Sequence, residues 1–172
     1  ATNTHPAAIT GHGSGAENGF RVQFVGAPSG TAIQNTTVSN LSWNANSIII
    51  RSCSPVFFNS KFISNASNGN SYIYLDGDGA PNIQHCRFDN ISLSIEADLR
   101  SCGDFLVEYN IFRNGYYPIS FWTRNNPVLN AGDIQYNDFE CISPNGSGKG
   151  CIYLFQMTGG ENIPLANNYW TG

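Results

Sequence analysis

The feature that most constrains the fold is a short pattern that returns along the chain. In the stretch "NIQHCRFDN", the large apolar residue Phe88 stands five positions after Ile83 and two positions after Cys86. The same arrangement recurs around anchor residues at Val38, Phe62, Phe88, Phe112, Phe139 and Trp170. These anchors are 24, 26, 24, 27 and 31 residues apart. Such a period is wrong for an amphipathic helix and is typical of one turn of a solenoid protein.

The two positions that accompany each anchor also keep their character. Five residues before the anchors stand apolar residues: Ile33, Phe57, Ile83, Val107, Ile134 and Leu165. Two residues before them stand small or amide-bearing residues: Thr36, Ser60, Cys86, Asn110, Asn137 and Asn168. If the repeats stack, we expect the asparagine amides to hydrogen-bond from one repeat to the next. Cys86 in that column is predicted to be a buried, inert thiol, and no cysteine is spaced to join His85 in a zinc site.

Each repeat is predicted to contain three short strands. The first ends at the apolar residue five positions before the anchor, and after a bend the second carries the anchor inward. A third follows in "NSIIIRS", "SYIYLDG", "SLSIEADL", "YPISFWT" and "GCIYLFQ", several of which alternate apolar and polar residues. The best helix candidate, "SIEADLRS", falls where a third strand belongs and is therefore predicted to be a strand. "GFRVQFVG" is predicted to open the first repeat.

These patterns predict an all-β chain that forms a parallel β-helix of about six rungs over residues 20–172, after a flexible or assembly arm at 1–19. The stretches "GAPNIQHCRFDN" and "NNYWTG" resemble rungs of the right-handed parallel β-helix superfamily. That superfamily includes pectate lyases, polysaccharide hydrolases and epimerases, and phage tailspikes. The resemblance covers roughly residues 20–172 and implies a single-stranded, right-handed β-helix, whereas it leaves the reaction open.

Composition narrows the possible partners and the compartment. Only 12% of residues are charged and the net charge is −4, which does not favour nucleic acid, and "SIIIRS" is far too short to span a bilayer. Glycosylation sequons begin at Asn35, Asn40, Asn65, Asn90 and Asn145. Their number favours a secreted or cell-surface protein. Five cysteines cannot all pair with one another; Cys141 and Cys151 flank the insertion "ISPNGSGKG", whose base a disulfide would close.

Charged residues beside the anchors are the most enzyme-like feature of the chain. The outward positions before the anchors include Lys61, Arg87 and Asp138, and those after the anchors include Asp89, Arg113 and Glu140. A β-helix lyase needs a base next to a neutralised carboxylate. Arg87 or Lys61 could serve as that base, with the carboxylates holding a cation such as calcium. A solvated face of alternating charges would show the same pattern. The "DGDG" turn at 76–79 is predicted to be a tight turn rather than a calcium site.

A second outward set is aromatic. If the third strands point their aliphatic residues inward, alternation sends the aromatic residues of those strands outward: Tyr72, Tyr74, Trp122, Tyr153 and Phe155. A monomer seldom exposes so many aromatic residues on one face. They could stack on sugar rings, meet another subunit, or be covered by a loop of the chain itself.

The predicted function is structural. The last rung, "NNYWTG", shows no capping helix, and the first residues are small, polar and glycine-rich. Solenoid ends normally need caps, so we expect either end-to-end stacking or a piece of a longer solenoid. The leading hypothesis is an extracellular, non-catalytic, glycosylated subunit that assembles with itself into a filament or surface layer, without a resident cofactor or metal. The alternatives are a polysaccharide lyase or epimerase acting on uronate-containing glycans, and a carbohydrate-binding or phage-type adhesion module.

Overall fold

The computed structural model describes residues 7–10, 21–41, 46–64, 71–76, 80–98, 105–114, 119–124, 133–140, 152–155, 165 and 167–171. Every regular element in this part of the chain is a β-strand, and the strands form three sheets. Each strand pairs with its sheet neighbours in parallel. The prediction of an all-β chain built from parallel strands is therefore confirmed.

The three sheets are called A, B and C in the order in which the chain first enters them. Sheet A contains β1 (Ala7–Thr10), β4 (Thr36–Leu41), β7 (Lys61–Ser64), β10 (Arg87–Asp89), β13 (Ile111–Arg113), β16 (Asp138–Glu140) and β18 (Tyr169–Thr171). Sheet B contains β2 (Val22–Val25), β5 (Asn46–Arg51), β8 (Ser71–Asp76), β11 (Ile91–Asp98), β14 (Ile119–Arg124) and β17 (Ile152–Phe155). Sheet C contains β3 (Ala32–Gln34), β6 (Val56–Phe58), β9 (Asn82–Gln84), β12 (Leu106–Glu108) and β15 (Asp133–Gln135).

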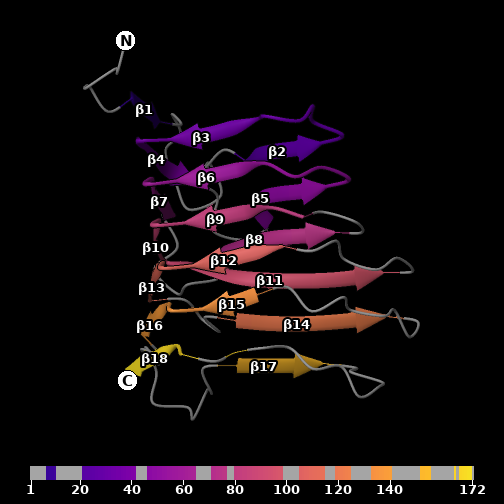
Figure 1. Cartoon of the computed structure of the whole chain (residues 1–172), viewed down its shortest axis with the longest axis vertical. Coiled ribbons are helices and arrows are strands. Elements are labelled where there is room, and N and C mark those ends of the chain that lie inside the picture. Colours follow the sequence, from indigo (N-terminus) through magenta and orange to yellow (C-terminus); the bar gives the residue numbers. More distant parts are fainter. Residues whose placement is uncertain are drawn as a thin grey trace.

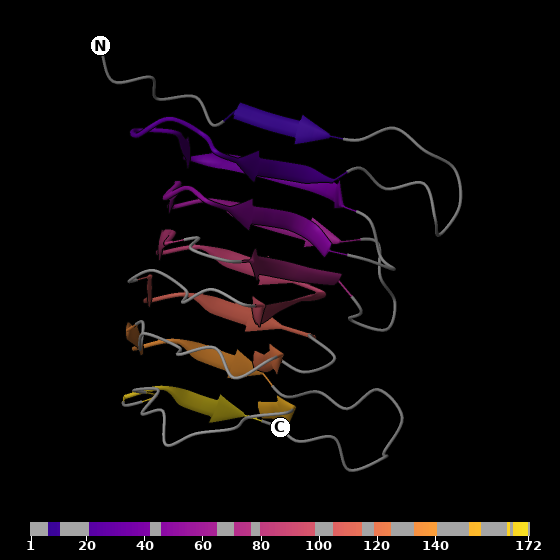
Figure 2. The same cartoon turned by 90° about the vertical axis from the view of Figure 1, so that its right-hand side faces the viewer.

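The chain visits these sheets in a fixed rotation. From β2 it passes through sheets B, C and A in turn and then returns to sheet B beside the strand that it left. Figures 1 and 2 show the result as a stack of passes that runs from the N-terminal strands at the top to the C-terminal strands at the bottom. This arrangement is compatible with a β-solenoid. Because each pass lies on the previous one, residues one repeat apart in the sequence become neighbours in a sheet.

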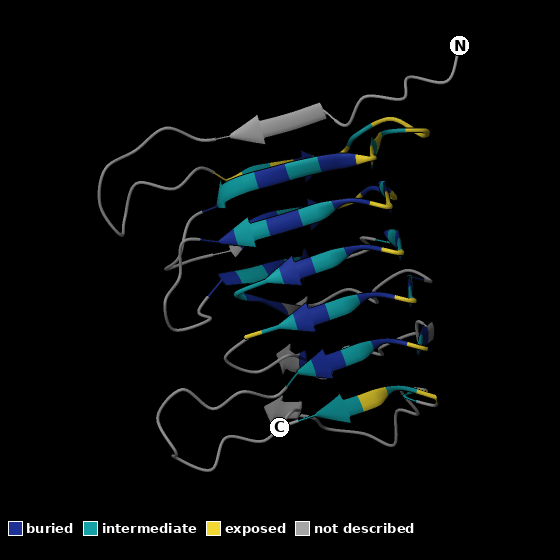
Figure 3. Ribbon diagram, turned by 90° about the vertical axis from the view of Figure 1, so that its left-hand side faces the viewer, coloured by how far each residue is buried: buried dark blue, intermediate teal, exposed yellow. Residues whose placement is uncertain are grey.

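The predicted anchors form one continuous column inside the stack. Phe62, Phe88, Phe112 and Phe139 occupy matching positions of neighbouring sheet A strands and are 0% exposed. Neighbouring rings along this run are stacked with centroids 4.8–5.0 Å apart, and Trp170 extends the stack at 4.5 Å from Phe139. Along the strands, buried residues alternate with partly exposed ones (Figure 3). The repeat seen in the sequence is thus a repeat of core positions.

Sheets B and C complete the core with their own columns. In sheet C, Ile33, Phe57, Ile83, Val107 and Ile134 lie in register, as predicted. In sheet B, Ile48 and Ile73 pair, as do Ile50 and Leu75, and all four are buried. "SIEADL" is strand rather than helix up to Asp98. The first strand of each repeat extends one residue beyond its apolar residue, to Gln84 in β9 for example. This outward residue still pairs with its sheet neighbours.

A sharp bend precedes the anchor strand of sheet A in every repeat, and in the first five repeats it joins sheet C to sheet A. The residue at this bend, three positions before the anchor, has a left-handed backbone with φ between 46° and 61°: Asn35, Asn59, His85, Tyr109, Tyr136 and Asn167. Asparagine tolerates this conformation, whereas bulky side chains disfavour it. The bend therefore explains the asparagines directly, but it does not explain the two tyrosines. No helix within the described residues is long and apolar enough to cross a membrane.

Candidate functional surfaces

The asparagine column lies just inside this bend and is a structural ladder. Oδ1 of Asn137 accepts hydrogen bonds from the backbone N–H and the side-chain Nδ2 of Asn110, at 2.9 and 3.0 Å. In the same way, Oδ1 of Asn168 accepts hydrogen bonds from the backbone N–H and the side-chain Nδ2 of Asn137, at 2.9 and 3.1 Å. Nδ2 of Asn137 also donates to the Val107 carbonyl at 2.8 Å. The predicted ladder is confirmed, and it satisfies polar groups that are buried in the core.

Cys86 continues this column toward the N-terminal end. Its side chain is 2% exposed, its Sγ donates to the Gln84 carbonyl at 3.3 Å, and its backbone N–H donates to Oδ1 of Asn110 at 2.8 Å. Burial raises the pKa of the Cys86 thiol from 9.0 to about 11. The thiol therefore stays protonated at neutral pH, as expected for an inert structural cysteine.

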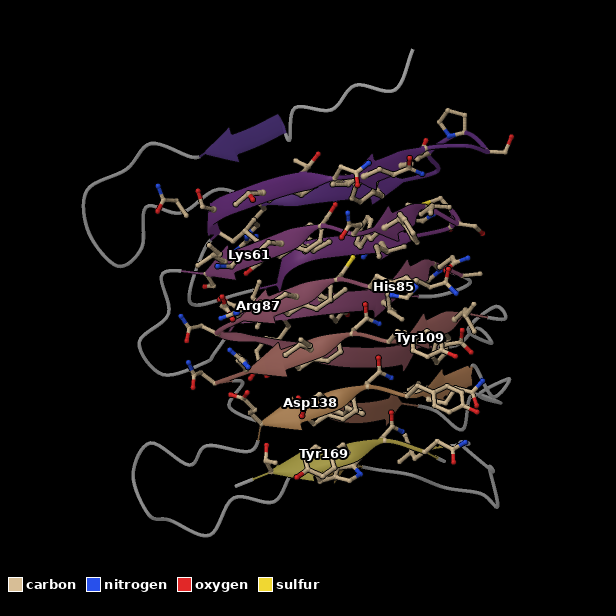
Figure 4. The ribbon with its side chains drawn as sticks, turned by 60° about the vertical axis from the view of Figure 1, so that its left-hand side comes forward. Lys61, His85, Arg87, Tyr109, Asp138 and Tyr169 are labelled. Carbon is tan, nitrogen blue, oxygen red and sulfur yellow. The ribbon has the colours of Figure 1, made fainter. Side chains whose placement is uncertain are left out.

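The charged residues that the sequence offered as a catalytic set share the outward face of sheet A. Lys61 pairs with Arg87 in register, and Arg87 lies beside Ile111, which separates it from Asp138. In the parallel column two positions along, Asp89 pairs with Arg113, and Arg113 with Glu140. Figure 4 shows Lys61, Arg87 and Asp138 in this order down the stack, on β7, β10 and β16. The six predicted residues thus share one face of sheet A, although Ile111 separates Asp138 from Arg87.

Ion pairs join most of these charges to one another. Asp89 lies 2.8 Å from Arg87 Nε and 3.3 Å from Lys61 Nζ. Arg113 Nε lies 2.7 Å from Glu140 Oε1, although the direction of its N–H is too oblique for a hydrogen bond. The hydrogen bond to Asp89 raises the pKa of Arg87, so this guanidinium is held more firmly in its charged form. An arginine in that state is a poor proton acceptor.

This face is better suited to cross-strand stabilisation than to cation binding. Asp89 and Glu140 stand in one column with Arg113 between them, so each carboxylate has a cation as its neighbour. In the described part of the chain, no three His, Cys, Asp or Glu side chains gather as metal ligands would. The three carboxylates proposed to hold calcium therefore do not form a cage. The Asp138 Oδ1 atom is buried without a hydrogen-bond partner.

The predicted aromatic face on sheet B is divided among several columns. Tyr72 pairs with Ser92, whereas Tyr74 pairs with Ser94 in a different column. Tyr153 pairs with Ser120 and so lies in the column of Tyr74, whereas Trp122 and Phe155 pair in a third column. Tyr72 and Tyr74 are half-buried, whereas for Trp122, Tyr153 and Phe155 the structure describes the backbone alone. The described part of this face is therefore not a continuous row of exposed rings.

A different aromatic row, missed in the sequence, stands at the bends between sheets C and A. His85, Tyr109 and Tyr136 stack with centroids 5.2 and 5.1 Å apart and with planes 7° and 5° from parallel. Phe58 packs edge-on against His85 at 5.4 Å. Tyr109 and Tyr136 are 48% and 46% exposed. We call Phe58, His85, Tyr109 and Tyr136 the bend strip. Counting back three positions from each anchor would have placed three of its members in one column.

A polar ladder runs beside the bend strip on sheet C. Gln84, Glu108 and Gln135 immediately precede the three stacked residues and lie in register. Glu108 accepts a hydrogen bond from Gln84 at 3.2 Å through one carboxylate oxygen and from Gln135 at 2.6 Å through the other. The polar ladder is therefore ordered by its own contacts. Figure 4 places His85 and Tyr109 on the other side of the view from Lys61 and Arg87.

The predicted modification sites are only partly covered by the structure. Asn35 is exposed at a bend, and its Oδ1 accepts a hydrogen bond from Asn59 at 2.8 Å. Asn40 and Asn90 are half-buried, and Nδ2 of Asn90 donates to the Ser64 carbonyl at 3.1 Å. The other predicted sites lie outside the described residues: Asn65, Asn145 and the Cys141–Cys151 pair. Cys53 and Cys86 are the free cysteines of the described part, and both are buried.

Comparisons with family models, with curated proteins and with solved structures found no match for the chain.

Proposed function

We propose that the chain is a right-handed parallel β-helix of about six rungs, of the pectate lyase-like or tailspike-like kind, and that it works outside the cell as a non-catalytic structural subunit. In this proposal, copies stack head to tail into a filament or surface layer. The parallel pairing of all three sheets supports it, because a second copy placed on the end would continue each sheet in the same direction.

The observation that carries the assembly proposal is the state of the two ends of the described stack. In the described part of the chain, β1, β2 and β3 at one end and β15, β17 and β18 at the other each pair on one side only. The core is also less closed at the C-terminal end: Trp170 is half-buried, whereas Phe139 in the same column is 0% exposed. Open parallel edges over a partly exposed core are templates for further strands. A head-to-tail contact of this kind does not close on itself and produces fibres.

Assembly is tested by adding a charge to one end. Val25 in β2 is 57% exposed and points outward. Val25→Lys should leave the fold intact and abolish rod formation, because a lysine blocks edge pairing. Leu106→Lys in the central strand β12 is the matched control and should still form rods. Sedimentation velocity and electron microscopy over a wide concentration range provide the readout. A wild-type protein that stays monomeric throughout, or rods that persist in Val25→Lys, would sink the proposal.

The second candidate function is a lyase or epimerase acting on uronate polymers, with calcium as its possible cofactor. One observation favours it: Lys61, Arg87 and the nearby carboxylates share one face of sheet A. The test is the absorbance of unsaturated products from a panel of uronate polymers with added calcium. Calcium-dependent activity that Arg87→Ala removes would support this candidate. A complete lack of activity, or equal activity in Arg87→Ala, would remove it.

Secretion and glycosylation are part of the same proposal. Asn35 is the exposed member of the three described sequon residues, so it is the best-placed acceptor among them. Secretion from a eukaryotic host, followed by mass spectrometry before and after glycosidase treatment, should show a glycan that Asn35→Gln reduces. An unmodified secreted protein would contradict this part of the proposal.

A further inference from the structure

Two residues of the bend strip, Tyr109 and Tyr136, adopt a backbone conformation that bulky side chains disfavour. The same left-handed bend is occupied by asparagine in three other repeats, at Asn35, Asn59 and Asn167. Tyr109 and Tyr136 adopt it with φ of 55° although tyrosine is disfavoured there. They also leave almost half of their surface exposed to water. Strained residues of this kind gather where a site requires a particular side chain, so the outlier points to a function.

The chemistry of the surface beside the rings indicates what it would bind. Stacking covers the ring faces between neighbours, so the outward ring edges and the phenol hydroxyl groups remain for a ligand. Next to them, Glu108 and its two glutamine partners form the ordered polar ladder. An apolar edge beside hydrogen-bonding groups, repeated in three successive rungs at His85, Tyr109 and Tyr136, matches the mixed surface of a sugar chain. Because the polar partners are already held in place, less ordering is needed on binding.

Charge decides between neutral and acidic ligands. Among the described residues, the last outward position of each sheet C strand contains the carboxylate of Glu108 but no lysine or arginine: Gln34, Phe58 of the bend strip itself, Gln84, Glu108 and Gln135. A uronate or nucleic-acid polymer would meet an uncompensated negative charge there. Lys61, Arg87 and Arg113 lie on strands of sheet A, and Arg51 lies on a strand of sheet B. We infer that the bend strip and its polar ladder bind a linear, neutral polysaccharide that lies along the long axis of the stack.

The structure itself supplies substitutions that test this inference. Tyr109→Asn and Tyr136→Asn install the residue that the same bend carries elsewhere, so the fold should be retained or stabilised. Tyr169→Asn is the control, because Tyr169 is 65% exposed but lies on sheet A, outside the bend strip. Thermal unfolding followed by circular dichroism checks the fold of each variant. The probes are hydroxyethylcellulose as a neutral polymer and polygalacturonate as an acidic one.

Affinity electrophoresis and titration calorimetry give the result. We expect hydroxyethylcellulose to retard the wild-type protein, and the double variant Tyr109→Asn/Tyr136→Asn to bind it at least on the order of tenfold more weakly. Tyr169→Asn should bind like the wild type. Equal binding by the folded double variant would overturn the inference, as would retardation by polygalacturonate alone. A third outcome would also overturn the inference. In it, the wild type does not bind hydroxyethylcellulose, and the double variant loses only the side-by-side association of copies. The bend strip would then be assigned to contact with a second copy of this chain.

Discussion

Asn137 shows how a single residue secures several parts of the stack. Its amide accepts from two groups of Asn110 and donates to the Val107 and Gln135 carbonyls, at 2.8–3.0 Å, while it is 1% exposed. At such a depth water cannot replace a lost partner, so each unmet donor or acceptor carries its full desolvation cost. The amide is therefore needed to hydrogen-bond the buried polar groups of the core rather than to bind a ligand.

Asn137→Ala should accordingly lower the free energy of unfolding by about 2–4 kcal/mol, because the Asn110 N–H and the Val107 carbonyl lose their partner. Asn35→Gly is the control: glycine accepts the left-handed bend, and the site is exposed, so the change should be small. Urea denaturation followed by fluorescence measures both. Equal effects of the two substitutions would contradict a buried ladder.

Cys86 provides a pH test of burial. Its folded pKa of about 11 exceeds the ordinary value of 9.0, so the unfolded chain loses the thiol proton first as the pH rises. The contribution of this residue to stability is therefore complete below pH 9.0 and is lost between pH 9.0 and about 11. Over this window we expect a loss of about 2–3 kcal/mol that is absent in Cys86→Ser.

Serine is a suitable replacement because Ser60 fills the same column one repeat earlier. Chemical denaturation at a series of pH values compares the two proteins. Parallel losses of stability in wild type and Cys86→Ser would show that other groups account for the pH dependence.

At the scale of elements, the phenylalanine column links the sheet A strands through their side chains. Phe112 in β13 stacks on Phe88 and on Phe139, at 4.8 and 5.0 Å, and is 0% exposed. Trp170 in β18 stacks on Phe139 and is only half-buried. A buried ring with two neighbours should therefore contribute more to stability than the larger ring at the end of the column.

Truncation to alanine tests this gradient. Phe112→Ala should cost about 3–5 kcal/mol, since it leaves a cavity between two rings, and Trp170→Ala should cost less than half as much. Urea denaturation of both variants gives the comparison. If the two costs are equal, or if Trp170→Ala is the more harmful, β18 is more deeply packed than its exposure indicates.

At the scale of the whole molecule, stability should vary along the stack. The central strands β9 to β13 have a neighbour on each side in their sheets, whereas the described end strands pair on one side only. Local opening needs less free energy where fewer neighbours must separate. Stacking of copies would give the end strands the neighbours that they lack.

Hydrogen exchange followed by mass spectrometry should therefore show two patterns. In the monomeric Val25→Lys protein, amides of β2, β3 and β18 should exchange faster than those of β9 to β13. In assembled wild-type protein, the end strands should gain protection while the centre changes little. Identical protection of the ends in both states would contradict end-to-end contact.

Several features could be predicted from the sequence because a stacked repeat turns local pattern into long-range neighbours. The inward columns of Ile83, Cys86 and Phe88, the asparagine ladder, and the register of Arg87 and Asp89 with charges of adjacent strands all follow from counting positions relative to the anchors. The expected strand in "SIEADL" followed from its place in the repeat as well. Once the period is known, sheet pairing leaves these neighbours little freedom.

Other features depended on the three-dimensional path of the chain and of its side chains. The stretch around His85 reads as one more bend, yet the left-handed backbone aligns His85, Tyr109 and Tyr136 into a stack. Asp89 meets both Lys61 and Arg87 because side-chain rotamers bring it there. The sequence by itself thus determined which residues share a column, since strand spacing and period impose it. Only the tertiary structure decided which outward side chains touch, because bend geometry and rotamers are not encoded by spacing alone.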